Sequence, residues 1–230
     1  MKKSMLFGTL ALLAGPLFAA DSNPKDDVMA AAQRLAATAS YSWSQTVVVP
    51  ESAQFKPGPT DGKTEKGGAT YVKMTFGDNT TEFVTQGDKA AVTDQDGDWQ
   101  SLTNLEKDSE GPGRFLSGMV RNYRTPAAQV TNLLAMVKEL KKDGDAYSGN
   151  LTEAGAKELL TFRRGGDATN PKGSVKFWVK DGTLKKYEFA VQGKVDFNGN
   201  DVDVDRDTTV VIKDVGTAKV NVPADAKKVL

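Results

Sequence analysis

The chain has 230 residues, of which 30 are basic and 30 acidic, and it contains neither histidine nor cysteine. These absences exclude Ser-His-Asp and Cys-His catalysis, zinc held by histidine or thiolate, and haem held by either residue. The balanced charge leaves no electrostatic footprint for nucleic acid. Because the chain forms no disulfides, packing alone must stabilise the fold. The composition therefore favours a protein without cofactor or metal that is not an enzyme.

Residues 1–20 have the pattern of an export signal. Lys2-Lys3 form a basic start, an apolar run follows over 5–13, and Ala19-Ala20 offer a small-residue cleavage site. The apolar run is too short to span a bilayer, and a cysteine for lipid attachment is absent. We therefore expect a periplasmic or secreted protein with no stable membrane span, whose residues 21–230 form a single domain.

A helix and an antiparallel meander are predicted after the signal. Asn23 and Pro24 are suited to begin a helix over 23–38. Alternating apolar and polar residues then predict a strand over 41–49, whereas 51–68 contain two prolines and four glycines and are expected to be a loop. Three strands joined by glycine-containing turns follow, over 71–76, 80–86 and 90–93.

The middle of the chain has helical spacing, and its last third is again β. Helices are predicted over 115–123, from Thr125-Pro126 to 137, and over 152–160, with an edge strand in 138–149. Strands are predicted over 175–180, 184–194, 205–213 and 219–222, with hairpin turns at Asp181-Gly182 and Asn198-Gly199. This order predicts an α+β fold, in which a curled antiparallel sheet forms an incomplete β-barrel with an N-terminal helix and a helical lid.

The acidic residues allow two chemical interpretations, and we favour neither. Asp196, Asn198 and Asn200 match the first ligand positions of a calcium loop, but Asp201 and Asp207 stand where such a loop needs glycine and a bidentate glutamate. A hairpin followed by a strand with one acidic solvent face explains this stretch better. Paired carboxylates hydrolyse glycosides without histidine, but the spacing in the sequence places no two of them across a cleft. We predict no metal site and no catalytic residue.

The order of elements resembles the LolA-like and LolB-like superfamily of periplasmic lipoprotein carriers and sorting proteins, including related lipid-binding mycobacterial lipoproteins. The resemblance rests on the N-terminal helix leading into Tyr41-Ser42-Trp43, on the unit that ends in 96–102, and on the segments 176–189 and 214–223. It implies an incomplete barrel with a helical lid over an apolar cavity. The expected partners are an acyl chain, a lipid or a lipoprotein, together with proteins of the cell envelope.

Inward-facing side chains of the sheet and of the lid over 111–137 are expected to bind this apolar ligand. The predicted ligand-binding residues are Trp43, Met74, Phe76, Phe115, Met119, Leu133, Phe177 and Trp178. The alternative is a structural or protein-interaction module with a packed core and no ligand. An empty apolar space of several hundred Å³ between sheet and helices would favour the carrier.

Overall fold

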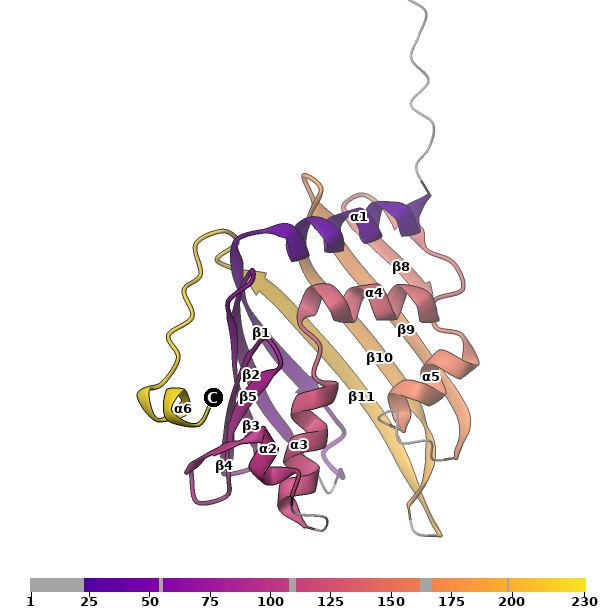
Figure 1. Ribbon diagram of the computed structural model, residues 1–230. Coiled ribbons are helices and arrows are strands. Elements are labelled where there is room, and N and C mark those ends of the chain that lie inside the picture. Colours follow the sequence, from indigo (N-terminus) through magenta and orange to yellow (C-terminus); the bar gives the residue numbers. More distant parts are fainter. Residues whose placement is uncertain (1–22, 54–55, 108–110, 162–166, 198) are drawn as a thin grey trace, which may run out of the picture.

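The computed structural model describes residues 23–53, 56–107, 111–161, 167–197 and 199–230. Within these ranges, 11 strands form one antiparallel sheet in the order β6-β5-β4-β3-β2-β1-β11-β10-β9-β8-β7. The sheet curls without closing (Figure 1), so the predicted α+β curled sheet is confirmed. The expected signal over 1–20 lies outside the described residues.

The two halves of the sheet are joined where the first strand pairs with the last, from Ser42↔Lys213 to Val48↔Asp207. The strands of the first half are β1 (Ser40–Val48), β2 (Pro57–Glu65), β3 (Ala69–Phe76), β4 (Asn79–Gln86), β5 (Lys89–Thr93) and β6 (Trp99–Ser101). Those of the second half are β7 (Lys141–Asp143), β8 (Ala146–Asn150), β9 (Ala168–Lys180), β10 (Thr183–Phe197) and β11 (Asn200–Lys213).

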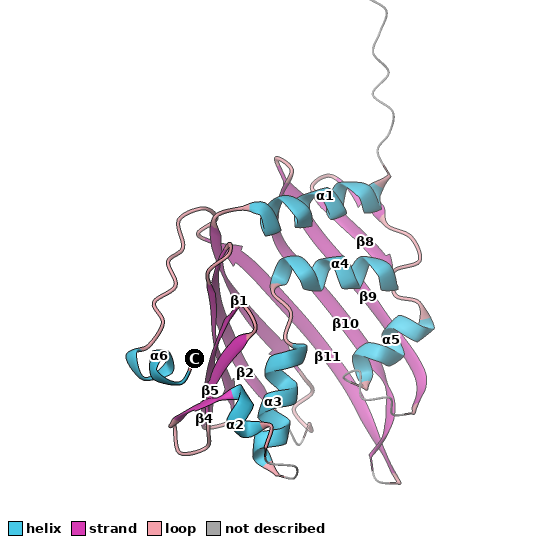
Figure 2. Ribbon diagram, viewed as in Figure 1, coloured by secondary structure: helices cyan, strands magenta, loops and turns pink. Residues whose placement is uncertain are grey.

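Helices cover one face of the sheet, which we call the inner face (Figure 2). They are α1 (Pro24–Ala37), α2 (Leu102–Leu105), α3 (Pro112–Asn122), α4 (Pro126–Met136) and α5 (Glu153–Leu160), whereas α6 (Ala224–Val229) lies on the opposite, outer face. The Asn23 side chain accepts the Lys25 amide at 3.0 Å, and the Thr152 hydroxyl accepts the Gly155 amide at 3.0 Å. In the described ranges, no helix has both the length and the apolar character that crossing a membrane requires.

The strand β2 corrects the prediction of a loop over 51–68. Its prolines and glycines indicated a loop, but its backbone pairs with β1 on one side and with β3 on the other. Gly62 lies opposite Trp43, and a Cβ atom at position 62 would overlap the Trp43 indole ring. The glycine therefore belongs to the strand because the neighbouring tryptophan occupies the space above it.

The expected strand over 219–222 is also wrong, because these residues are irregular and lead into α6. Val220 and Val222 alternate because they pack on the outer face of the sheet, and the Val220 amide is held by Glu65 Oε1 at 2.8 Å. Together with α6 they cover a small outer core whose buried residues are Ala69, Val84, Ala91 and Ala226. The alternation thus reflects packing and not strand pairing.

The alternation in the long strands of the second half is confirmed. Val175 and Phe177 of β9 are buried on the inner face, and the hairpin at Asp181-Gly182 has the positive φ values, 52° and 66°, of a tight two-residue turn. Asn198 lies outside the described residues. The acidic row of β11 faces solvent as expected, with exposed side chains at Asp201, Asp203, Asp205 and Asp207.

Candidate ligand-binding face

The predicted ligand-binding residues divide into two groups, of which the first lies on the inner face. Trp43, Leu133 and Phe177 belong to the main core, with exposed fractions of 2%, 1% and 0%. Met74 and Met119 are partly buried and pack against the same core. The structure therefore brings five of the eight residues to one apolar region, drawn from β1, β3, α3, α4 and β9.

The second group lies apart from this region. Phe76 is partly exposed at the end of β3, and Phe115 of α3 is 52% exposed. Trp178 faces the outer side of β9, because it adjoins the inward Phe177 and successive strand residues point to opposite faces. The ammonium groups of Lys176 and Lys186 lie 4.9 and 4.5 Å from its ring centroid, as in cation–π contacts.

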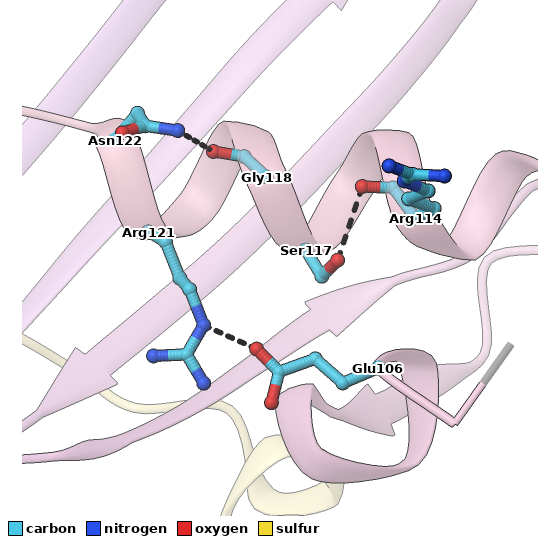
Figure 3. Close-up of polar contacts among 6 residues, drawn as sticks. All are labelled: Glu106, Arg114, Ser117, Gly118, Arg121 and Asn122. Carbon is cyan, nitrogen blue, oxygen red and sulfur yellow. Dashed lines mark hydrogen bonds and ion pairs between the residues drawn. The ribbon is translucent and has the colours of Figure 1, made fainter. Parts of the chain in front are cut away.

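The side of α3 that faces the sheet differs by one residue from the predicted side: Leu116 and Val120 are buried where Phe115 and Met119 were expected to point inward. The buried residues of this helix are Gly113, Leu116, Ser117 and Val120. Its polar contacts in Figure 3 are local: the Ser117 hydroxyl donates to the Arg114 carbonyl at 3.0 Å, and Asn122 donates to the Gly118 carbonyl at 2.8 Å. Arg121 pairs with Glu106, the residue that ends α2.

A buried polar cluster joins the sheet to the junction of α3 and α4, and sequence reasoning missed it. Trp43 hydrogen-bonds with the hydroxyl of Tyr123, the residue that ends α3. The Tyr187 hydroxyl of β10 donates to Gln129 Oε1 of α4. The ring of Tyr123 also packs edge-on against Phe83, with centroids 4.9 Å apart. These contacts fix the C-terminal end of α3 to the sheet.

Tyr41 of β1 is the third phenol of this cluster. Its hydroxyl bonds with the Thr125 side chain and with the backbone of Ala127, at the start of α4. Burial raises the pKa of Tyr41, Tyr123 and Tyr187 above the ordinary value of a phenol, so all three stay neutral. Within the described part of the chain, every buried side-chain polar atom has a partner. The periodicity of the sequence cannot reveal such a cluster, because a tyrosine at an inward position fits the apolar pattern and its hydroxyl group gives no further signal.

A groove of about 970 Å³ lies on the outer face, across β8 to β11. Its lining includes the charged side chains of Lys176, Glu188 and Asp207 and the exposed apolar side chain of Val48. This groove differs in place from the apolar space expected between sheet and helices.

Comparisons with known proteins support the architecture. Neither a protein-family model nor a curated protein matches the chain. Among solved structures, the Mycobacterium tuberculosis lipoprotein LppX aligns with a TM-score of 0.50 and 15% identity, over 87% of this chain and 98% of LppX. LprF from Mycobacterium bovis aligns with a TM-score of 0.48 and 16% identity, over 88% and 97%. The resemblance to mycobacterial lipoproteins that the sequence indicated is thus confirmed as a likeness in fold.

Proposed function

We propose that this chain is an extracytoplasmic binding protein, not an enzyme, that holds an acyl chain, a lipid or the acyl chains of a lipoprotein on the inner face of its sheet. The observation that carries the proposal is the make-up of that face, where the partly buried Met74 and Met119 pack against the main apolar core. Unbranched methionine side chains adapt to ligands of varied shape. The likeness in fold to the lipoprotein LppX supports the same function.

The helix α3 is the element that would admit the ligand. Its inward residues Leu116 and Val120 are buried, and its exposed ion pair with Glu106, made by Arg121 close to its C-terminal end, contributes little stability. The bond between Trp43 and Tyr123 holds this same C-terminal end of the helix to the sheet. We therefore place the hinge at Tyr123, so that the N-terminal end of α3 swings away from the sheet.

The second candidate is an envelope interaction module with a packed core, whose partners are other proteins. It is favoured by the burial of Trp43, Leu133 and Phe177 in one continuous core. A ligand would have to displace α3 from this core before it could lie against the sheet. The two candidates therefore differ in whether the protein binds an acyl probe at all.

Substitution Met119→Asp tests the proposed ligand site. We expect the wild-type protein to bind a fluorescent long-chain fatty acid and the variant to bind it at least about tenfold more weakly, because an unpaired carboxylate in an apolar site is costly. The free energy of unfolding should change by only about 1 kcal/mol, since Met119 already contacts water. Probe titration and chemical denaturation measure the two quantities.

The matched control is Ala135→Asp, which places the same charge on the exposed side of α4. It should leave both affinity and stability close to those of the wild type. A wild-type protein that binds no acyl probe, together with a strongly destabilised Met119→Asp variant, would contradict the carrier and favour the packed module.

A further inference from the structure

The outer face of β8 to β11 is an uncovered surface of the sheet. Among the described helices, α6 is the one that lies on the outer face, and it packs against β5 and β6 in the other half of the sheet (Figure 2). The groove of about 970 Å³ lies over the uncovered half. Its lining includes the small residues Ser174, Ala190 and Thr209 of three neighbouring strands. Their size allows a second surface to approach the sheet closely.

Charges of opposite sign border this uncovered surface on its two sides. The alternation of side chains places Lys172 and Lys176 of β9 in the same outward row as Ser174. It places Asp205 and Asp207 of β11 in the outward row of that strand. All four charged side chains are exposed, and within the described ranges none of them makes an ion pair. The surface therefore has a basic border and an acidic border, with β10 between them.

The register of the sheet makes these two borders complementary to each other. Gln192 of β10 is in register with Lys172 on one side and with Asp205 on the other. Because neighbouring strands have a constant spacing of about 4.8 Å, this cation and this anion lie at the same level and equally far from β10. A twofold axis parallel to β10 would therefore place Lys172 of each copy opposite Asp205 of the other, in two equivalent contacts.

We propose that the outer face of β8 to β11 binds a second copy of this chain, with the twofold axis along β10. The neutral side chains of Ala190 and Gln192 lie nearest to this axis. The charged residues of β10 are compensated within each copy, since Glu188 pairs with Lys186 at 2.6 Å and Lys194 pairs at 3.6 Å with an aspartate of β11. Sheets pack face to face about 10 Å apart, a distance that opposing lysine and aspartate side chains span.

The same axis also covers an exposed apolar residue, Val48 of β1, whose side chain is 65% exposed. Across the sheet, Val48 lies two strands from Ala190 on one side, and Asn150 lies two strands from it on the other. The twofold axis thus places Val48 of one copy over Asn150 of the second copy. The inner face stays outside this contact, so the inference is independent of the proposed function.

Sedimentation of the wild-type protein tests whether this dimer exists. We expect a monomer–dimer equilibrium at about 50 mM salt, and we expect the dissociation constant of the dimer to rise severalfold at about 0.5 M salt, because salt screens the paired charges. A protein that stays monomeric at about 0.1 mM in the low-salt buffer would overturn the inference. That result would leave the proposed function standing, since acyl binding takes place on the other face.

Charge reversal then assigns the dimer to this face. Lys172→Asp and Asp205→Lys each place like charges opposite one another at both equivalent contacts, so each should raise the dissociation constant at least about tenfold. An equal mixture of the two variants should dimerise about as tightly as the wild type, because each variant carries the charges that the other lacks. The double variant, with both changes in one chain, should recover the dimer as well.

The matched control is the pair Lys66→Asp and Asp88→Lys, which makes the same charge changes at exposed turns in the first half of the sheet. Neither control variant should change the dissociation constant, and mixing the two should have no effect. All four variants should unfold in urea like the wild type, since their side chains are exposed. Single variants on β9 and β11 that dimerise like the wild type, or a mixture of them that stays monomeric, would overturn the inference.

Discussion

At position 62, a hydrogen in place of a side chain decides how β1 and β2 pack. A Cβ atom on Gly62 would overlap the Trp43 ring, whereas one on Gly118 in α3 would meet nothing within 4 Å. We expect Gly62→Ala to lower the free energy of unfolding by about 1–3 kcal/mol, as overpacking does. Gly118→Ala should raise it by about 0.5–1 kcal/mol, because alanine is the better helix former. Urea denaturation of both variants measures the two changes.

Equal effects of the two substitutions would contradict this account of Trp43. The same tryptophan also bonds with the Tyr123 hydroxyl, so a displaced ring would disturb the end of α3 as well. Gly62→Ala is therefore expected to weaken acyl binding in addition to stability, whereas Gly118→Ala leaves the inner face unchanged. One residue on β2 thus affects the geometry of the proposed hinge.

At the scale of elements, α6 stabilises the sheet from its outer side. Ala226 is fully buried in the outer core, on a helix that packs against β5 and β6, whereas Ala224, two residues earlier on the same helix, is exposed. We expect Ala226→Asp to lower the free energy of unfolding by at least about 2 kcal/mol, because it buries an unpaired charge. Ala224→Asp adds an acid to the first turn and should be neutral or slightly stabilising. Thermal and urea unfolding compare the two variants, and similar losses would show that α6 does not pack as described.

The sequence predicted those elements whose pattern comes from burial of one face. Alternation put Tyr187, Phe189 and Val191 on one face and located both long hairpin strands. It could not find β2, because a strand held by its two neighbours and covered by Trp43 needs no apolar pattern of its own. Val220 and Val222 led to the opposite error, a predicted strand that does not exist. Their alternation arises because both side chains pack on a face of the sheet.

The sequence predicted only part of the candidate site, because a periodic pattern does not decide which side of an element faces the core. A helical pattern identifies the apolar side of α3 but not its rotation toward the sheet, so Phe115 was placed inward where Leu116 lies. Trp178 and Phe177 are adjacent, and only the burial of the strand decides which of them faces the helices. The polar cluster around Tyr123 depends on contacts between distant segments, for which one sequence carries no signal.

At the scale of the whole molecule, the sheet separates two environments. Its inner face carries the main apolar core and the proposed hinge at Tyr123, and its outer face carries α6, the acidic row of β11 and the groove. The proposed role of a carrier in the cell envelope would require export from the cytoplasm.

Export is the last prediction, and it concerns the segment before the described fold. We expect cleavage near Ala19 or Ala20, because the basic start, the apolar run and the small residues follow the order that signal peptidase requires. Cleavage there leaves Asn23 and the start of α1 intact. Leu12→Arg interrupts the apolar run and should retain the protein in the cytoplasm, whereas Ser4→Arg adds the same charge to the basic start and should not.

Cell fractionation and N-terminal sequencing check both variants against the wild type. A protein found outside the cytoplasm with Met1 still in place would contradict the cleavage. Export that persists in the Leu12→Arg variant would show that residues 1–20 are not the signal, since a charge within the apolar run interrupts the pattern that defines one. Retention of the wild-type protein in the cytoplasm would remove the reason for placing an acyl carrier in the cell envelope, because the fold alone does not determine the compartment.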